Sequence, residues 1–188
     1  MKIVDVKELT NGQFIKPVEI VYEQSGQIKR WEAVRAHDSV ALLLYHTQKE
    51  AFVLVKQFRP ALYLQHELAY TYELCAGIVD KEKSLEEIAY EEAVEETGYA
   101  PKKIEKITSF FTSVGFAGSR QTLFYAEVDE SMREGAGGGI EQEEIEVFFL
   151  PVKKAKAFMF DERKPKTPGL LFAFCWWFSR PERTYPDL

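Results

Sequence analysis

Several features that mark particular classes of protein are scarce or missing in this chain. Its 188 residues include only two cysteines and three histidines. No apolar run approaches the roughly 18 residues that a transmembrane helix requires. No cluster of Lys and Arg offsets the net charge of −6. These absences argue against a membrane span and against general affinity for nucleic acid.

The few cysteines and histidines show no pattern of their own. Cys75 and Cys175 stand far apart in apolar surroundings, so we expect both to be reduced core residues and not a disulfide or metal pair. The histidines lack metal-ligand spacing, and we expect them to be structural or exposed. The first residues, MKIVDVKELTNGQF, carry acids and amides where a signal peptide needs an apolar stretch. We therefore expect a cytoplasmic protein.

What is present is enough apolar sequence for one domain and a small appendage. SVALLLY and AFVLVKQF predict central strands joined by a short hairpin. Further strands are predicted in YTYELCAGIVD, KITSFFTS, RQTLFYAEV and IEVFFLPV, and helices in residues 85–97, KKAKAFMF and PGLLFAFCWWFS. Because βαβ repeats are few, this order favours an α+β sandwich with helices on a mixed sheet. We predict a separate N-terminal β-hairpin region over residues 1–36 and one domain over 37–188.

The segment SLEEIAYEEAVEETG is a helix with clear ends. Ser84 and Glu87 match a capping box, in which the hydroxyl accepts an amide at the helix start and the glutamate reaches back. Gly98 suits the left-handed residue that ends a helix.

Acidic residues lie on the face of this helix that should be buried. At about 100° per residue, Glu92 and Glu96 fall inside the apolar stripe, and Glu95 falls at its edge. The stripe itself is formed by Leu85, Ile88 and Ala89. One explanation is that the second half of the helix is solvated. The other is a hard divalent cation such as Mg²⁺, which offsets the repulsion between the carboxylates and shares its other positions with water and phosphate.

These residues resemble the Nudix box, G-x5-E-x7-R-E-U-x-E-E-x-G-U, in which U is a bulky apolar residue. Gly77, Glu92, Glu95, Glu96 and Gly98 stand at the required spacing. The first glutamate of the box is replaced by a lysine and its arginine by a glutamate. The two departures, Lys83 and Glu91, reverse both charges, and we hypothesise that they form an ion pair of inverted polarity.

The resemblance extends through HDSVALLLY, FVLVKQFRPALY, YELCAG, GSRQTLFYAEV and KTPGLLFAFCWW. These segments are similar to the nucleoside-diphosphate-sugar branch of the Nudix hydrolases, first to UDP-glucose pyrophosphatases and next to ADP-ribose pyrophosphatases. The resemblance implies an α/β/α sandwich, a homodimer and Mg²⁺-dependent hydrolysis of a nucleoside diphosphate sugar, with Mn²⁺ able to replace Mg²⁺. A Nudix-fold module that binds a nucleotide sugar without cutting it is the alternative, and the reversed charges at Lys83 and Glu91 favour it.

The resemblance also assigns roles to individual residues. Glu92, Glu96 and the Ala76 carbonyl would hold the metal, with Glu95 beside them as a catalytic residue. In GAGGGIEQEEIEV, whose glycines are expected to permit motion, Glu141 matches the position of the catalytic base, with Glu143 the alternative.

Four further residues are candidates for substrate binding. Arg59, at the end of a predicted strand, would clamp the diphosphate, because a guanidinium is a planar fork for phosphate oxygens. Arg120 would serve sugar or phosphate recognition. Arg30 and Trp31 would cover the base, although Trp31 is also a plausible packing residue of its strand.

Overall fold

The computed structural model describes residues 2–10, 12–140 and 143–181 and is built around one mixed sheet. Its strand order is β5-β4-β3-β8-β7, with β6 also paired to β3 and β9 to β4. The pairing of β3 with β8 is parallel, and the other pairings are antiparallel. The strands are β3 (Ser39–His46), β4 (Ala51–Gln57), β5 (Thr71–Glu73), β6 (Cys75–Ile78), β7 (Glu105–Thr112), β8 (Ser119–Val128) and β9 (Ile145–Pro151).

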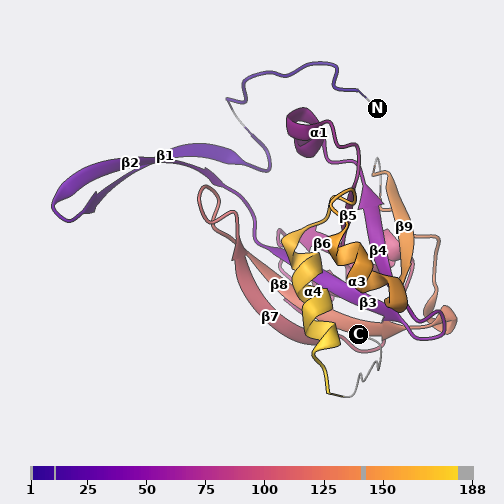
Figure 1. Cartoon of the computed structure of the whole chain (residues 1–188). Coiled ribbons are helices and arrows are strands. Elements are labelled where there is room, and N and C mark those ends of the chain that lie inside the picture. Colours follow the sequence, from indigo (N-terminus) through magenta and orange to yellow (C-terminus); the bar gives the residue numbers. More distant parts are fainter. Residues whose placement is uncertain (1, 11, 141–142, 182–188) are drawn as a thin grey trace.

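Helices cover both faces of this sheet (Figure 1): α2 (Leu85–Glu92) and a π-helix (Ala93–Thr97) lie on one face, and α3 (Val152–Phe160) and α4 (Pro168–Phe178) on the other. Helix α1 (Pro60–His66) and a 3₁₀ turn (Glu130–Met132) contribute no buried residue. Alternate residues of β3 enter two separate cores: Leu42 packs with Ile88 and Ala89 of α2, and Leu43 with Phe174 and other residues of α3 and α4. Because side chains of a strand alternate between faces, the continuous apolar run of β3 fits a sheet that is buried on both sides. The α+β sandwich predicted from the sequence is confirmed.

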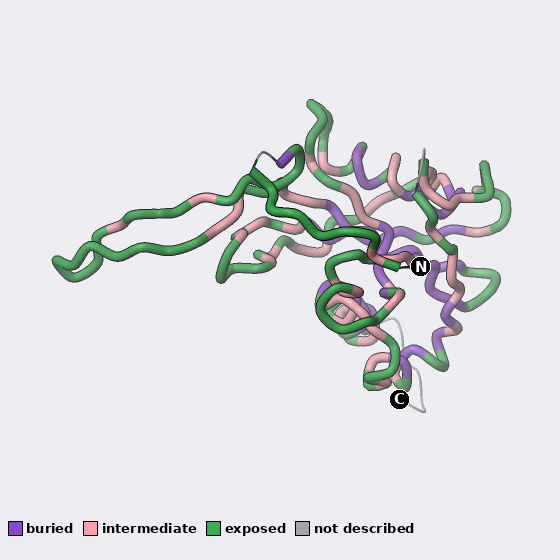
Figure 2. The backbone as a smooth tube through the Cα atoms, turned by 90° about the horizontal axis from the view of Figure 1, so that it is seen from above, coloured by how far each residue is buried: buried purple, intermediate pink, exposed green. Residues whose placement is uncertain are grey.

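The N-terminal segment forms a separate arm. Strands β1 (Lys16–Gln24) and β2 (Gln27–Arg35) pair only with each other among the described strands. The arm extends away from the sheet and is exposed along most of its length (Figures 1 and 2). At its base it is held to the turn between β7 and β8, where the Trp31 indole donates to the Gly115 carbonyl at 2.7 Å and the Val34 amide to Phe116 at 2.8 Å.

Three features differ from the sequence-based expectations. Helix α1 was not predicted, although Pro60 stands at its first turn, where proline is favoured. Cys75 is buried and free as expected, but Cys175 is exposed. Helix α4 is apolar on nearly all sides, so only packing decides that Phe174 and Trp177 face the sheet and Cys175 faces outward. The third difference is the π-helix.

No helix within the described part of the chain is both long enough and apolar enough to cross a membrane.

Candidate active site

The acidic helix begins as the sequence predicts. The Ser84 hydroxyl accepts from the Glu87 amide at 3.2 Å, and the Glu87 carboxylate accepts from the Ser84 amide at 2.8 Å. The capping box is confirmed.

The end of the helix differs from the regular α-helix expected over residues 85–97. After Glu92 the chain widens into a π-helix, Ala93–Thr97. Thr97 stabilises this turn by donating its hydroxyl to the Ala93 carbonyl at 2.5 Å. Gly98 then takes the left-handed conformation, with φ 77°. A π-turn holds an extra residue, so the 100° spacing fails for Glu95 and Glu96. Such turns are found frequently at functional sites.

The glycine-rich segment caps the C-terminal end of this helix. The amide of Gly138 donates to the Glu96 carbonyl at 2.8 Å, and the amide of Gly139 to the Glu95 carbonyl at 3.0 Å. A Cβ on Gly137 would lie 2.5 Å from the Glu96 carbonyl oxygen. The last carbonyls of a helix need partners from outside it, and here the loop backbone supplies them. The absence of a side chain at Gly137 therefore allows close backbone approach, and the expectation that these glycines permit motion stays a prediction.

Two carboxylates of this helix, those of Glu92 and Glu96, lie against strand β6. Glu96 is only 5% exposed and accepts a hydrogen bond from the Ala76 amide at 3.0 Å. Glu92 is half-buried and lies against Gly77, where an added Cβ would overlap its carboxyl group. The glycine of the box is thus required by the space that Glu92 occupies.

Ala76 presents its backbone to the same carboxylates. In an antiparallel pair, the amide and carbonyl of a residue point to the same side. The Ala76 amide donates to Glu96 and not to Ala41, its partner in β3. We infer that the Ala76 carbonyl also points away from β3, toward the acidic helix.

The two carboxyl groups resist ionisation. Burial raises the pKa of Glu92 from 4.5 to about 7, and the charge of Glu95 adds to the effect. Burial raises the pKa of Glu96 to about 8, and the charges of Glu92 and Glu143 add smaller contributions. Loss of hydration disfavours the charged form of a carboxyl, and like charges act in the same direction. A bound cation would remove this cost.

The donor set fits a hard divalent cation that shares its coordination sphere. Among the described residues, no three His, Cys, Asp or Glu side chains are close enough together to hold a metal ion by themselves. The chain therefore offers two carboxylates and a backbone carbonyl. Mg²⁺ is commonly bound in this way, through one or two carboxylates, with water and substrate phosphates in the remaining positions.

A cation of the protein lies beside the acids. Arg59 follows β4, and its Nε and Nη2 donate to the two carboxylate oxygens of Glu73 at 2.8 and 2.7 Å. Glu73 is buried on β5. This bond is the main reason that the pKa of Arg59 is raised, and the charges of Glu96 and Glu143 contribute further. Glu73 was not identified from the sequence. The pairing of β4 with β5, which aligns Val55 with Glu73, brings it to Arg59.

The structure describes one of the two candidate bases. Glu143 lies near the acidic helix, since its charge acts on both Glu92 and Glu96, and its carboxylate accepts from the Ile140 amide at 3.1 Å. Glu141 lies outside the described residues. The choice between them stays a prediction.

The remaining substrate-binding candidates contact groups other than Glu92 and Glu96 within the described part of the chain. Arg30 and Trp31 lie on the arm, where Arg30 is paired with Glu19 at 2.6 Å. Arg120 lies on β8, where its amide donates to Asp38 at 2.8 Å and its guanidinium lies 3.4 Å from the same carboxylate. The structure does not bring these three residues together with Glu92 and Glu96.

The inverted charge pair is present. Lys83 contacts Glu91 directly, and Lys81 lies 3.6 Å from the same carboxylate. Lys83 lowers the pKa of Glu91, in the direction expected for a favourable pair.

This pair leads to a test by charge exchange. Lys83→Glu and Glu91→Lys should each lower activity, because each places two like charges side by side at the start and middle of the acidic helix. The double variant should recover most of the loss. Initial rates and thermal midpoints of the four proteins decide the question. A double variant as impaired as the worse single variant would show that the pair has no such role.

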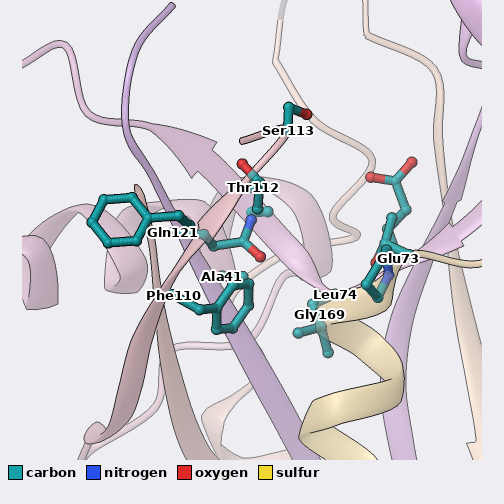
Figure 3. A pocket seen from close by; sticks show the side chains of 12 residues that line it. Ala41, Glu73, Leu74, Phe110, Thr112, Ser113, Gln121 and Gly169 are labelled. Atoms are coloured by element: carbon teal, nitrogen blue, oxygen red, sulfur yellow. The ribbon is translucent and has the colours of Figure 1, made fainter. Parts of the chain in front are cut away.

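A cavity of about 420 Å³ adjoins the site (Figure 3). Its described lining comes from β3, β5, β6, β7 and β8, from the residues that follow β5 and β7, and from the start of α4. The lining residues are Ala41, Glu73, Leu74, Ala76, Phe110, Phe111, Thr112, Ser113, Gln121, Thr167, Pro168 and Gly169. Gln121 is among them and its neighbour Arg120 is not. Gln121 was not identified from the sequence. The alternation of side chains along a strand, which separates Gln121 from Arg120, is the signal that could have indicated it.

Comparison with known proteins gives consistent results. The NUDIX domain model matches residues 35–169. The chain is 40% identical to uridine diphosphate glucose pyrophosphatase NUDT14 of Bos taurus, over 94% of this chain and 93% of the relative. It is 39% identical to the same enzyme of Mus musculus, over 90% of each chain. It is 37% identical to a GDP-mannose pyrophosphatase of Pectobacterium atrosepticum, over 86% of this chain and 77% of the relative.

These matches cover the capped acidic helix, the strand that carries Ala76 and Gly77, and the sheet that places them. The resemblance seen in the sequence is confirmed, and the chain belongs to the NUDIX family.

Proposed function

We propose that this protein hydrolyses the pyrophosphate bond of a nucleoside diphosphate sugar, releasing a nucleoside monophosphate and a sugar phosphate. The relatives at 37–40% identity are named for UDP-glucose and GDP-mannose. The single observation that carries the proposal is the grouping of the buried Glu96 and the half-buried Glu92 with the Ala76 backbone and Arg59.

We assign the cofactor to Mg²⁺, with Mn²⁺ able to replace it, since Nudix hydrolases generally use divalent metals. Glu92, Glu96 and the Ala76 carbonyl would hold the ion. When bound, a divalent cation neutralises diphosphate charge and lowers the pKa of coordinated water. The protein's own residues position the reactants, which is most of the catalysis in phosphoryl transfer.

Each of the other residues has a definite task in this proposal. Arg59, held by Glu73, presents its remaining N–H groups to phosphate oxygens. Glu141, or Glu143 in its place, accepts the proton of the attacking water. Glu95, at the π-turn, adds negative charge beside Glu92 and so strengthens the site for a cation.

The proposal also includes a homodimer in the cytoplasm. In support, the arm exposes apolar side chains that a monomer leaves in water, among them Ile20, Val21, Ile28 and Trp31. In a dimer, Arg30 and Trp31 would act on the base bound by the other subunit.

Incubation with UDP-glucose, GDP-mannose and ADP-ribose, with and without Mg²⁺, tests the activity. Release of a nucleoside monophosphate that depends on Mg²⁺ is the expected result. The contacts of Lys83 with Glu91 preserve an attraction at the two reversed positions, so these positions no longer favour a module that only binds. Binding of a nucleotide sugar without release of monophosphate from any of them would nevertheless establish such a module.

The raised pKa values lead to a pH-dependent effect of Mg²⁺ on stability. The folded protein, with Glu92 and Glu96 titrating near 7 and 8, holds more protons than the unfolded chain between about pH 4.5 and 8. The stability of the metal-free protein should therefore fall as pH rises across this window. Mg²⁺ binds the ionised carboxylates, so its stabilising effect should grow with pH.

Thermal midpoints at pH 5.5, 7 and 8.5, with and without Mg²⁺, measure this effect. The Glu92→Gln/Glu96→Gln variant is the control, and its midpoint should respond little to Mg²⁺. The same Mg²⁺-dependent increase at all three pH values would contradict the assignment of these carboxylates to the metal.

The catalytic base can be identified by two matched variants. Glu141→Gln should lower turnover by about 100-fold or more while leaving substrate affinity nearly unchanged, because a general base contributes about 10²–10⁴-fold. Glu143→Gln should have the smaller effect on turnover. The reverse ranking would transfer the role to Glu143. Single-turnover rates and dissociation constants for the same substrate separate the two effects.

A further inference from the structure

The cavity beside the acidic helix is continuous with the proposed metal site. Glu73 and Ala76 line the cavity, and both belong to the site: Glu73 holds Arg59, and the Ala76 amide binds Glu96. A diphosphate held by Arg59 and a metal near Ala76 would therefore place one of its two substituents at the cavity mouth. Figure 3 shows Gln121, Thr112 and Phe110 on one side of this space and Glu73 and Leu74 on the other.

The lining is unsuited to an anion. No Lys, Arg or His is among the described lining residues. Its one carboxylate, Glu73, already accepts two hydrogen bonds from Arg59. A phosphate group in this cavity would contact no basic side chain of the lining and would be repelled by the carboxylate of Glu73. The occupant is consequently a neutral part of the substrate.

The polar groups of the lining match a polyhydroxylated ring. Three hydroxyl side chains and one carboxamide contribute to it: Thr112, Ser113, Thr167 and Gln121. Hydroxyls donate and accept, and a carboxamide offers two donors and one acceptor oxygen. Phe110 and Phe111 add apolar surface for the C–H groups of a sugar. At about 420 Å³ the cavity falls within the range of small-ligand sites, roughly 300–1,000 Å³.

Gln121 is the side chain best placed to read hydroxyl groups. Its amide nitrogen donates to the Ser39 hydroxyl at 3.2 Å, which fixes the orientation of the carboxamide. Its oxygen lies toward Gly169, where a Cβ would be only 2.8 Å away. Any side chain at position 169 would therefore push the Gln121 oxygen out of its present position. This oxygen is then available as an acceptor for a ligand hydroxyl.

The base of the substrate has a different candidate location. Trp31 is exposed and is held by the Gly115 carbonyl. An aromatic ring face of this kind suits stacking of a base. In the proposed dimer each subunit's Trp31 would cover the base bound by the other subunit, and the cavity would be left for the sugar.

We propose that this cavity receives the sugar of the nucleoside diphosphate sugar and that Gln121 is a specificity-determining residue for it. The inference rests on the proposed function.

Two substrate panels and the Gln121→Met variant test this inference. The first panel keeps uracil and varies the sugar: UDP-glucose, UDP-galactose and UDP-N-acetylglucosamine. The second keeps glucose and varies the base: UDP-, GDP- and ADP-glucose. Methionine keeps the length of the side chain and removes its hydrogen-bonding groups. Ratios of kcat/KM within the sugar panel should change by about 5-fold or more, since one neutral hydrogen bond contributes about 1 kcal/mol. Ratios within the base panel should be unchanged.

The remaining outcomes are also decisive. A change confined to the base panel would assign the cavity to the base and overturn the inference. Unchanged ratios in both panels would show that Gln121 does not determine specificity and would overturn the inference. Gln27→Met, an exposed glutamine at the arm's tip, is the matched control. If the wild-type protein hydrolyses none of these compounds, the proposed function fails, and dissociation constants for the same two panels then test the cavity separately.

Discussion

Glu96→Gln should reduce turnover by at least about 100-fold while leaving the fold intact. Glutamine has nearly the same shape, so its amide oxygen can still accept from the Ala76 amide. The substitution removes the negative charge that a cation requires. Even residues that only orient metal ligands commonly contribute 10–100-fold to affinity or activity, and we assign Glu96 to the metal itself.

The stability of this variant gives an independent readout. Glu96 is buried and its pKa is raised to about 8, so its ionised form is costly without a metal. Metal-free Glu96→Gln should therefore unfold at the same temperature as the wild-type protein or higher near pH 8, and Mg²⁺ should stabilise it less. Glu86→Gln, on an exposed position of the same helix, is the matched control. Near-normal turnover in Glu96→Gln would remove this residue from the site.

Arg59→Ala should have the second large effect, a loss of about 100-fold in kcat/KM. A positioned donor to developing charge typically contributes 10²–10³-fold. Glu73→Gln should lower kcat/KM by about 10-fold, because it replaces one acceptor for the guanidinium with a donor and so misorients Arg59. If Glu73 acts only through Arg59, adding Glu73→Gln to Arg59→Ala should cause no further loss. The complete double-mutant cycle measures this coupling.

Stability should follow the reverse pattern in this cycle. Arg59→Ala leaves the buried Glu73 carboxylate without its partner, which costs up to about 3 kcal/mol. Glu73→Gln removes that charge, so the double variant should be more stable than Arg59→Ala while remaining equally inactive. Additive losses of activity would show that Glu73 has a separate role. Full activity of Arg59→Ala would contradict the phosphate clamp.

The sequence was sufficient where local rules determine the structure. The capping box at Ser84 and Glu87 depends only on residues three apart, and the strands β3 and β4 follow from their apolar runs. The α-helical spacing up to Glu92 also predicted an acidic side chain on the face toward the core, whereas the position of the buried Glu96 depends on the π-turn that follows.

The rest depends on contacts between distant segments. The π-turn at residues 93–97 and its closure by Gly138 and Gly139 join positions more than 40 residues apart, and no local pattern announces them. The partnership of Arg59 with Glu73 arises from strand pairing, and the position of Gln121 in the cavity from the way α4 meets β8. Sequence periodicity predicts which face of a helix or strand a residue lies on, but it does not predict which residue of another element it will contact.

The glycine loop has a practical consequence for chimeras. The amides of Gly138 and Gly139 donate hydrogen bonds to the carbonyls of Glu96 and Glu95. These hydrogen bonds fix the loop to the acidic helix as far as Gly139. Any swing of the downstream segment has to pivot beyond Gly139, unless the main-chain bonds to the helix are broken. A loop transplanted from a relative to alter substrate choice should accordingly be spliced after Gly139. A junction placed before Gly137 would disturb the proposed metal ligands along with the loop.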